Sequence, residues 1–595
     1  MTEQQYDEIS IRISGENGDG IFSAGEMLAK ICSRSGLHVH GSRAYQSIIR
    51  GGHVSFSVRA RKREVRAPAD YVDVLVAFRS ESFVTDAGPM MRPGGIVLYD
   101  SEGMKITNPQ VPEGVVLKDI PAKSIAKEID RTLKPLFNTV FVGAALGLYN
   151  FNLKVVEDLI NDQFGSKGDK IVSVNIQAIK AGFDWARENC ETINHTITFG
   201  DQRSVFIGGN EALSLGMLNG GLQSYAWYPM TPATPVGAFL AKYGPMAGCV
   251  VKQMEDEINV ANFAVGAGFA GARSACATSG GGFALMTEAV GFAAMIEAPV
   301  VFIEVSRGGP STGLPTKTEQ GDLNQLLGAS QGDFPRAIIA QTSVEDGFYL
   351  GQEALNIAEK YQIPVIIASD LYLGEHFETV KEFDFSRVGI ARGKLITEDL
   401  PEDEPYLRYK LTDDGVSPRS IPGVRNGMHD AGSDEHDEHG FLVSDRRAGS
   451  PEAILIRTQQ MEKRMKKLEV LAKELPPPVA DGHSPDDADI LFVGWGSSLD
   501  VIREARSQLE KDGMKTAQLH IKYVLPFHGE EVGSILRGYE AKGVKILMVE
   551  ANYTGQMARH IRAETGFEIK DKYLRYDSEY ILPREITQWV QGRYS

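Results

Sequence analysis

The chain has few cysteines for its length. Only Cys32, Cys190, Cys249 and Cys276 occur among 595 residues, and no two of them form a CxxC pair. Zinc sites and iron–sulfur clusters are usually held by closely spaced cysteines. The sequence therefore predicts reduced thiols and no cluster of its own. Any cluster that this protein works with must be carried by another chain.

Long apolar runs are also missing. No stretch approaches the roughly 20 consecutive apolar residues that a membrane-spanning helix needs. The first residues, Met1–Gln5, are polar and acidic, unlike the basic and apolar parts of a secretory signal. We therefore expect a cytoplasmic protein that has no membrane partner.

Positive charge is in deficit. The 62 lysines and arginines are outnumbered by 79 acidic residues, which gives a net charge of −17, and no long basic run occurs. Nucleic acids and anionic membranes are bound through basic patches, so neither is expected as the main partner. At about 150 residues per domain, the length predicts three or four domains.

Apolar and polar residues divide the chain into four segments. Strand-like runs alternate with helical patterns over 1–195, 200–395 and 488–595, which is typical of doubly wound, parallel α/β domains. The segment 396–487 is instead a linker, acidic and proline-rich at its ends, with one charged helix around Gln459–Leu475. We expect Val205–Ile207 to be the first strand of the second domain.

A glycine-rich turn follows the first predicted strand. Gly15–Gly20 precedes a helix expected over Ile21–Ser35, whose free N–H groups are able to hold an anion. Thiamine diphosphate enzymes bind Mg²⁺ with a Gly-Asp-Gly start and an asparagine roughly 25 to 30 residues later, and this second oxygen ligand is absent here. A structural turn and an anion site both stay open for Gly15–Gly20.

Two arginines lie close to glycines in the same domain. Arg43 belongs to Ser42–Tyr45, and Arg50 begins the stretch Arg50–His53. Arginines in such surroundings are suited to grip a phosphate or pyrophosphate, for example that of coenzyme A. A structural ion pair at Arg50 is an equally good interpretation.

A proline-rich segment stands in the second domain. Tyr228–Pro235 contains three prolines, each of which fixes φ and removes an N–H donor. The resulting stiff loop, with the hydroxyl of Thr231 exposed, is suited to hold a small substrate. A plain connector between two domains is the alternative.

Three more segments follow predicted strands of this domain. Glu255–Glu257 opens a helix rich in small residues, where one carboxylate in a dry interface could exchange a proton with a ring nitrogen, although acids there also favour the helix dipole. Thr278–Gly282 ends one strand and opens a helix, which is the usual ligand position in a parallel sheet. Arg307 ends the next strand and is either a carboxylate clamp or a structural arginine. We expect Thr231, Ser279 and Arg307 to meet at one sheet edge.

A histidine-rich and acidic stretch lies in the linker. His429, His436 and His439 accompany four acidic residues at 434, 435, 437 and 438. This composition would suit a metal site, but the spacing fits no standard ligand set. We expect a solvated, hydrogen-bonded loop and no metal.

Several of these motifs resemble the α subunit of 2-oxoacid:ferredoxin oxidoreductases. The resembling segments are Tyr228–Pro235, Met254–Glu257, Ala277–Gly282 and Ser306–Gly313. The N-terminal part, with Gly15–Gly20 and Ile49–His53, is similar to the γ subunit of the same enzymes, so the chain resembles γ fused to α. Gly321–Leu323 and Asp434–Gly440 look most like the 2-oxoglutarate type.

The resemblance implies a fold and a set of site residues. Its fold consists of a γ-type α/β domain, a thiamine-diphosphate pyrimidine-type domain and a C-terminal α/β domain like that of transketolase. Glu257 matches the carboxylate that meets the pyrimidine ring and is the expected catalytic residue. Thr231 and Arg307 match contacts to the substrate carboxylate. The other matched positions are Pro232 beside the substrate, and Tyr228, Ser279 and Gly280 beside the cofactor.

The resemblance also implies that the chain needs partners. A β subunit would complete the thiamine diphosphate site, carry Mg²⁺ and the [4Fe-4S] clusters, and form a dimer of αβ heterodimers that reduces ferredoxin. Coenzyme A would take the acyl group, so that 2-oxoglutarate yields succinyl-CoA and CO₂; the reverse reaction fixes CO₂ in the reductive tricarboxylic acid cycle. The alternatives are the same chemistry on pyruvate or a branched-chain 2-oxoacid, and a non-catalytic scaffold or regulatory chain.

Overall fold

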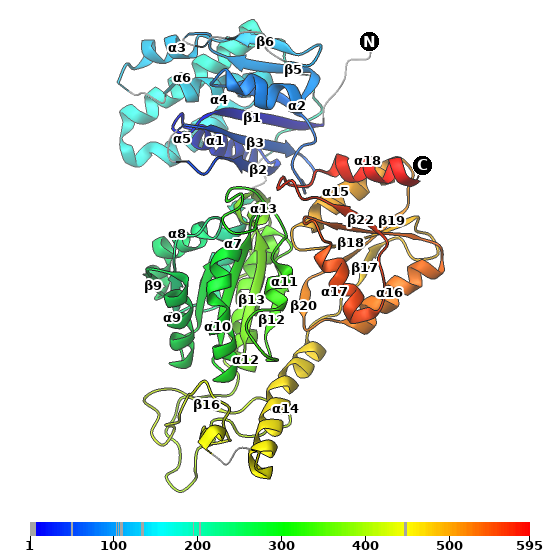
Figure 1. Cartoon of the computed structure of the whole chain (residues 1–595). Coiled ribbons are helices and arrows are strands. Elements are labelled where there is room, and N and C mark those ends of the chain that lie inside the picture. The colour runs from blue at the N-terminus through cyan, green and yellow to red at the C-terminus, as the bar shows by residue number, and fades with distance from the viewer. Residues whose placement is uncertain are drawn as a thin grey trace. The chain divides into compact units, whose positions relative to one another are not determined.

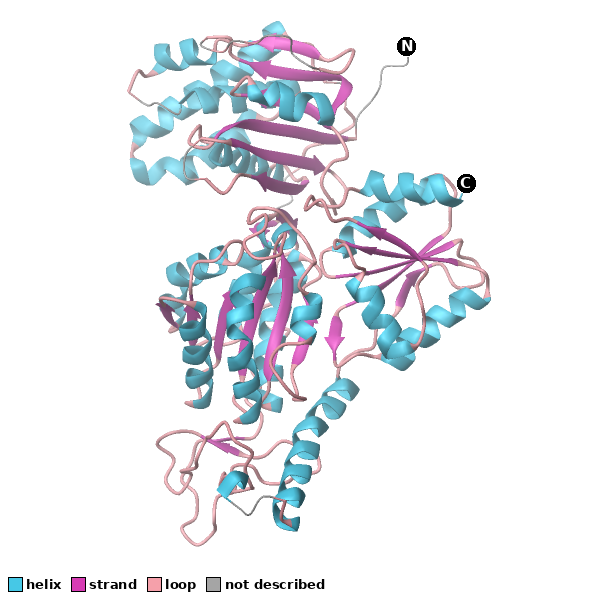
Figure 2. Ribbon diagram, in the orientation of Figure 1, coloured by secondary structure: helices cyan, strands magenta, loops and turns pink. Residues whose placement is uncertain are grey.

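The computed structural model describes residues 7–48, 51–102, 104, 106, 111–132, 136–193, 195–200, 204–445 and 449–594. The chain divides into two compact units, whose elements are labelled in Figure 1 and coloured by type in Figure 2. The first unit is Met1–Gly208 with His376–Glu382 and Leu582–Arg584; the second is Gly209–Glu375, Phe383–Ile581 and Glu585–Ser595. Within the described ranges, no helix has the length and apolarity needed to cross a membrane.

The described residues of the first unit form an eight-stranded sheet in the order β6-β5-β4-β1-β3-β2-β14-β7. Its strands are β1 (Glu8–Glu16), β2 (His38–Ala44), β3 (His53–Arg61), β4 (Val72–Ala77), β5 (Met91–Tyr99), β6 (Val116–Asp119), β7 (Val205–Gly208) and β14 (Phe377–Val380). β1, β4, β5 and β6 run parallel, whereas β3 is antiparallel to both β1 and β2.

The helices of the first unit pack closely. The longer ones are α1 (Ile21–Arg34), α3 (Ala122–Ile129), α4 (Leu136–Leu148), α5 (Leu153–Phe164) and α6 (Asp169–Asn189). α4 is buried along its whole length and crosses α6 through glycines. A Cβ on Gly143 would lie 2.1 Å from the carbonyl oxygen of Ile179, and one on Gly182 would lie 1.9 Å from that of Val140. Only glycine permits this approach of the two backbones.

The sequence prediction for the first unit is right in class and wrong in detail. The helix expected over Ile21–Ser35 is α1, and the mixed α/β class is confirmed. The sheet is not wholly parallel, because only eight residues separate β2 from β3, too few for a crossover helix, and the two strands pair antiparallel. Val205–Ile207, expected to begin the second domain, lies in β7 and pairs with β14 in the first sheet.

In the second unit, the described residues form a seven-stranded sheet in the order β20-β12-β13-β11-β10-β8-β9, parallel except for β20. Its strands are β8 (Ser224–Trp227), β9 (Val250–Gln253), β10 (Ser274–Thr278), β11 (Val300–Ser306), β12 (Ala337–Ala340), β13 (Pro364–Asp370) and β20 (Tyr523–Leu525). The helices that belong to it are α7 (Gly209–Asn219), α8 (Thr234–Tyr243), α9 (Glu257–Phe269), α10 (Gly280–Met295), α11 (Leu323–Leu327), α12 (Val344–Tyr361) and α13 (Leu371–Glu375).

The rest of the second unit contains a long helix and another sheet. The helix α14 (Pro451–Glu474) begins well before the expected position, because Ser450 caps it by accepting from the backbone N of Ala453 at 3.2 Å. The described C-terminal residues form a five-stranded sheet in the order β17-β19-β18-β21-β22. Its strands and the helices between them are β17 (Ala480–Gly482), β18 (Ile490–Trp495), α15 (Ser498–Lys511), β19 (Thr516–Ile521), α16 (Gly529–Ala541), β21 (Lys545–Glu550), α17 (Gln556–Thr565) and β22 (Asp571–Leu574). The last helix, α18 (Pro583–Tyr594), begins in the first unit and continues in the second from Glu585.

A buried aspartate lies in the first sheet. Asp73 on β4 is 2% exposed, and its Oδ1 lies 3.3 Å from Nε of Arg92. Burial raises the pKa of Asp73 to about 7, although the charge of Arg92 opposes this rise. Between about pH 4 and pH 7 the folded unit thus holds a proton that the unfolded chain has released. The stability contributed by this proton is lost as the pH rises through that window.

We expect Asp73→Asn to raise the midpoint of thermal unfolding at pH 8, where the wild-type protein keeps an ionised carboxylate buried. At pH 5, where the wild-type side chain is protonated, the variant should differ little. Thermal scans at both pH values test this. Asp7→Asn is the control, because the Asp7 side chain is 62% exposed. A stabilisation by Asp73→Asn that is the same at both pH values would contradict the raised pKa.

Candidate active site

The carboxyl ends of the parallel strands bring together the residues that the sequence singles out. Tyr228–Pro232 follows β8, Glu257 opens α9 after β9, Ser279 follows β10, and Arg307 follows β11. The four strands are neighbours in the order β9-β8-β10-β11, so the chain moves from one side of β8 to the other between β9 and β10. Such a switch point is where open α/β sheets bind their ligands.

The proline-rich loop is held from two sides. Nδ2 of Asn210, a fully buried residue of α7, donates to the carbonyl oxygen of Pro232 at 3.0 Å. Nη1 of Arg307 donates to the carbonyl oxygen of Thr231 at 2.6 Å. Thr231 and Arg307 therefore meet as predicted, but through the backbone of Thr231 and not through its hydroxyl. Tyr228, at the start of the loop, is 37% exposed.

The three consecutive acids at the start of α9 differ in their surroundings. Asp256 is the N-cap, and its carboxylate accepts from the backbone N of Asn259 at 2.8 Å. Glu255 accepts from Nδ2 of the same asparagine at 2.7 Å. Glu257 instead is buried, at 4% exposure, and its Oε1 has no hydrogen-bond partner. Two acids thus stabilise the helix start, while the third offers an unsatisfied carboxyl group.

Glu257 lies against the first turn of α10. A Cβ on Gly282 would lie 2.0 Å from Oγ1 of Thr278 and 2.8 Å from both Cγ and Oε1 of Glu257. The absence of a side chain at Gly282 therefore makes room for the carboxyl group of Glu257.

A cavity of about 490 Å³ opens beside these residues, with Ser279, Gly280, Arg307 and Asp322 in its wall. The hydroxyl of Ser279 and Nε of Arg307 are both buried and have no hydrogen-bond partner. Burial lowers the pKa of Arg307, and the negative charge of Asp322 opposes this effect. Unpartnered buried donors beside a cavity of this size are typical of a small-molecule site.

Sequence reasoning assigned neither of two acidic residues to this site, although one of them lies in the stretch Gly321–Leu323. Asp322 accepts from Oγ of Ser306 at 2.8 Å, and Glu304 lies behind it on β11 with 1% exposure. The available signal was a single glutamate inside the otherwise apolar run Val300–Val305. A charged residue in a fully buried strand requires a partner, and local patterns do not show which one.

The histidine-rich stretch is a packed part of the linker. His436 is fully buried, with its ring centroid 3.7 Å from that of Tyr409 and its Nε2 3.3 Å from the carbonyl oxygen of Met295. Nδ1 of His429 lies 3.2 Å from the carbonyl oxygen of Gly427. The prediction of hydrogen bonding is thus met, but solvation is wrong for His436, which packs under Tyr409. Among the described residues, no group of three or more potential ligands could hold a metal ion.

Arg43 has its contacts within the first unit. Its guanidinium pairs with Glu26 and lies 4.5 Å from the ring centroid of Phe377. Nε of Arg43 is buried without a partner, so the side chain keeps one donor unused. Arg50, the other arginine expected to bind phosphate, lies outside the described residues.

The glycine-rich turn is closed by its own aspartate. Oδ2 of Asp19 accepts from the backbone N of Glu16 at 2.9 Å and from Nε of Arg79 at 2.7 Å. Gly20, the N-cap of α1, has φ of 80° and provides no side-chain cap. The amino end of α1 thus begins at a turn in which the carboxylate of Asp19 is already engaged.

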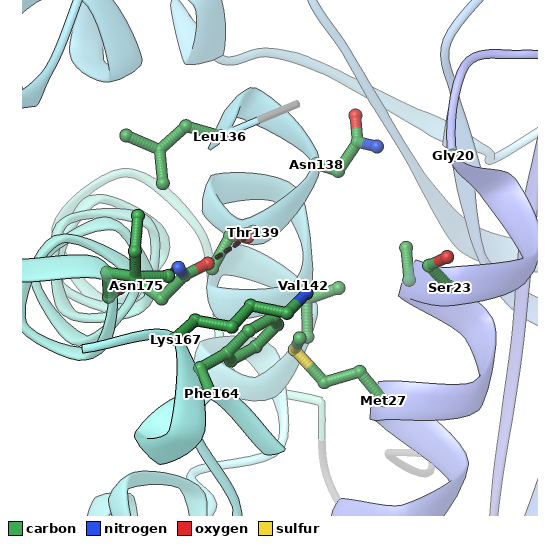
Figure 3. A pocket seen from close by; sticks show the side chains of 12 residues that line it. Gly20, Ser23, Met27, Leu136, Asn138, Thr139, Val142, Phe164, Lys167 and Asn175 are labelled. Atoms are coloured by element: carbon green, nitrogen blue, oxygen red, sulfur yellow. Dashed lines mark hydrogen bonds between the residues drawn. The ribbon is translucent and has the colours of Figure 1, made fainter. Parts of the chain in front are cut away.

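A second cavity, of about 340 Å³, lies in the first unit between α1, α4 and α6 (Figure 3). Its walls are mostly apolar, and Lys167 extends across it beside Phe164 (Figure 3). Nδ2 of Asn138 donates to the carbonyl oxygen of Asp19 at 2.6 Å, while Oδ1 of Asn138 is buried without a partner. Gly20, the last residue of the glycine-rich turn, forms part of its wall, but no sequence pattern indicated an apolar cavity here.

Comparison with known proteins identifies the class. Residues 215–450 match a family profile described as "Pyruvate flavodoxin/ferredoxin oxidoreductase, thiamine diP-bdg", and residues 10–185 match one described as "Pyruvate ferredoxin/flavodoxin oxidoreductase". A 2-oxoacid:ferredoxin oxidoreductase α subunit of Aeropyrum pernix is 32% identical over 98% of this chain and 97% of its own length. The 2-oxoglutarate oxidoreductase subunit KorA of Mycobacterium tuberculosis is 29% identical over 94% and 88%.

A solved structure agrees with these relatives. The 2-oxoglutarate:ferredoxin oxidoreductase from Magnetococcus marinus, determined with 2-oxoglutarate, coenzyme A and succinyl-CoA bound, has a TM-score of 0.90 and 31% identity over 99% of this chain and 100% of that one. The fold and the matched profiles define an oxidoreductase subunit with a thiamine diphosphate-binding domain. The chain belongs to the 2-oxoacid:ferredoxin oxidoreductases, as an α subunit with the γ-type region fused in front of it. The resemblance seen in the motifs is confirmed.

Alanine substitutions at two neighbouring glycines, Gly282 and Gly281, test the close contact at Glu257. A Cβ at position 282 would overlap Thr278 and displace Glu257, so we expect Gly282→Ala to lower turnover of the assembled enzyme by roughly a hundredfold. Gly281→Ala is the matched control, because the nearest atom to its Cβ would be the carbonyl oxygen of Ser311 at 3.8 Å. Viologen reduction with a 2-oxoacid measures turnover, and thermal scans check folding. Equal activity of the two variants would contradict the contact.

Proposed function

We propose that this chain is the γ–α subunit of an enzyme that converts 2-oxoglutarate and coenzyme A to succinyl-CoA and CO₂ and passes the electrons to ferredoxin. The similar Magnetococcus marinus structure holds 2-oxoglutarate, coenzyme A and succinyl-CoA. The 2-oxoglutarate synthase subunit KorA of Archaeoglobus fulgidus is 32% identical over 65% of this chain and 98% of its own length. The observation that carries the proposal is the buried, unpartnered carboxyl group of Glu257 at the switch point of the sheet.

The residues present fit the pyrimidine end of thiamine diphosphate. Oε1 of Glu257 lacks a partner, and a ring nitrogen placed beside it would satisfy this atom. The hydroxyl of Ser279 is a second unsatisfied group, next to Gly280, and Tyr228 stands at the start of the neighbouring loop. When bound, the cofactor supplies the nucleophilic carbon at which 2-oxoacids lose CO₂. Glu257 would hold a proton at the ring nitrogen and so favour the reactive tautomer.

Arg307 is the proposed clamp for the substrate carboxylate. Its Nη1 is fixed on the carbonyl oxygen of Thr231, which orients the planar guanidinium, and its Nε is still without a partner. A carboxylate would therefore find donors already in position. Pro232, held by Asn210, keeps the Thr231 carbonyl in place.

The exposed apolar residues of α9 and α10 support the proposal that a partner subunit binds here. Ile258 and Phe263 of α9 are 52% and 37% exposed, and Leu285 of α10 is 53% exposed. Helices with apolar residues on both their buried and their exposed sides are usually covered in the complete protein. We propose that a β subunit carrying Mg²⁺ and [4Fe-4S] clusters covers this face next to Glu257, in a dimer of αβ heterodimers.

We further propose a division into functional domains. The γ-type domain would span 1–195, the pyrimidine-binding domain 200–395 apart from β7 and β14, which belong to the first sheet, the linker 396–487 and the transketolase-like C-terminal domain 488–595. Coenzyme A is assigned to the γ-type domain, with Arg43 and Arg50 as its phosphate contacts. The buried, unused Nε of Arg43 supports this role, although the ion pair with Glu26 competes with it.

Glu257→Gln tests the cofactor assignment. We expect this variant, reconstituted with the β subunit, to lose 2-oxoacid decarboxylation, because an amide cannot hold the proton that the ring nitrogen requires. Assembly with the β subunit should be unchanged by size-exclusion chromatography. Glu255→Gln, in the exposed position beside it, is the control and should keep full activity. Turnover like that of the wild type in Glu257→Gln would rule out the assignment.

Arg307→Ala tests the substrate assignment. Charge-assisted hydrogen bonds contribute about 1.5–3 kcal/mol each, so KM for the 2-oxoacid should rise at least roughly tenfold, while KM for coenzyme A stays constant. A panel of 2-oxoglutarate, pyruvate and a branched-chain 2-oxoacid, compared by kcat/KM in the wild-type enzyme, decides the substrate. No turnover of any of them would favour the scaffold role.

A further inference from the structure

A carboxylate of this chain lies at the amino end of α10. A Cβ on Gly280, the first residue of α10, would lie 2.3 Å from Oδ2 of Asp322, so this carboxylate touches the helix end directly. The N-cap residue Ser279 makes no capping hydrogen bond with its own side chain. Asp322 therefore provides, from a distant part of the sequence, the negative charge that the amino end of a helix favours.

The carboxylate of Asp322 has a neutral neighbour. Glu304 is buried on β11, and this burial raises its pKa well above the ordinary value. The charge of Asp322 and a hydrogen bond to it raise the pKa further, and Asp370 on β13 adds to the effect. Glu304 thus keeps its proton and donates it toward Asp322.

The segment that bears Asp322 is fixed by the C-terminal sheet. The backbone N of Gln320 donates to the carbonyl oxygen of Ala551 at 2.6 Å, and Nε2 of Gln320 donates to that of Trp495 at 3.0 Å. Nε2 of Gln556 donates to the carbonyl oxygen of Gly321 at 2.6 Å. With the bond from Ser306 to the carboxylate itself, these contacts hold Asp322 from both sides of the chain.

Two places in the same cavity attract anions. One is the amino end of α10, and the other is Arg307, which shares the cavity wall with Asp322 and Gly280. We propose that Asp322 is a positioning residue that closes the end of α10 to anions. The substrate carboxylate is thereby directed to Arg307, and the end of α10 is kept for an uncharged ring. The parts that concern substrate and ring rest on the proposed function.

Asp322→Asn in the assembled enzyme tests this proposal, with inorganic sulfate as the probe anion. The amide keeps the shape and still accepts from Ser306, but it removes the charge from the helix end. We expect sulfate, competing with the 2-oxoacid, to inhibit the variant at roughly tenfold lower concentration than the wild type. The change should be in KM and in the sulfate inhibition constant, with kcat altered less.

Glu304→Gln is the matched control. It replaces one neutral hydrogen-bond donor with another in the same buried pair, so its sulfate inhibition should stay within about twofold of the wild type. A sulfate effect in Glu304→Gln as large as that in Asp322→Asn would overturn the proposal, because repacking and not charge would then explain both. Unchanged sulfate inhibition in an active Asp322→Asn would also overturn it.

A second variant and a binding assay test the proposal even if Asp322→Asn is inactive. Gly280→Ala would push the carboxylate away from the helix end and should reproduce the sulfate sensitivity of Asp322→Asn. Without substrate, sulfate should raise the thermal midpoint of Asp322→Asn more than that of the wild type. Equal shifts would reject the closed helix end. If the wild-type enzyme turns over no 2-oxoacid, the proposed function fails, while this sulfate shift still decides about Asp322.

Discussion

The second unit depends on a close contact between the starts of two helices. Glu257 begins α9 and lies against the first turn of α10. A side chain at position 282 would overlap Glu257, so only glycine fits there. This contact requires β9, β8 and β10 to be neighbours and to end at the same edge, which the strand order provides. The contact also keeps the carboxyl group of Glu257 out of water. A buried oxygen without a hydrogen-bond partner costs free energy unless a bound ligand satisfies it.

Charge in this region is distributed unevenly among acids that look alike in the sequence. Glu255 and Asp256 each accept a hydrogen bond from Asn259, whereas Oε1 of Glu257 has no hydrogen-bond partner. Burial beside Asp322 raises the pKa of Glu304 well above its ordinary value, whereas Asp322 lies at the amino end of α10. Position relative to helix ends and to solvent, and not residue type, decides the role of each acid.

Much of the site could be predicted because it is local. Ser279 and Arg307 follow strands of a parallel sheet, and strand ends of such a sheet share an edge. The rest depends on contacts between distant segments. Nothing near Asp322 shows that it will reach Gly280, nothing near Val205 shows that it will pair with β14, and His436 is buried by Tyr409 and Met295. Family resemblance, and not periodicity, selected Glu257 from its acidic neighbours.

The antiparallel pairing of β20 with β12 has a consequence for folding during synthesis. β12 leaves the ribosome long before β20. The β12 edge of the seven-stranded sheet therefore stays unpaired while the linker, α14 and the first strands of the C-terminal sheet are synthesised. An open strand edge is a site for wrong pairing, and long-range β contacts form slowly. The nascent second unit therefore passes through a stage in which β12 has been made but its outer edge has not yet paired with β20.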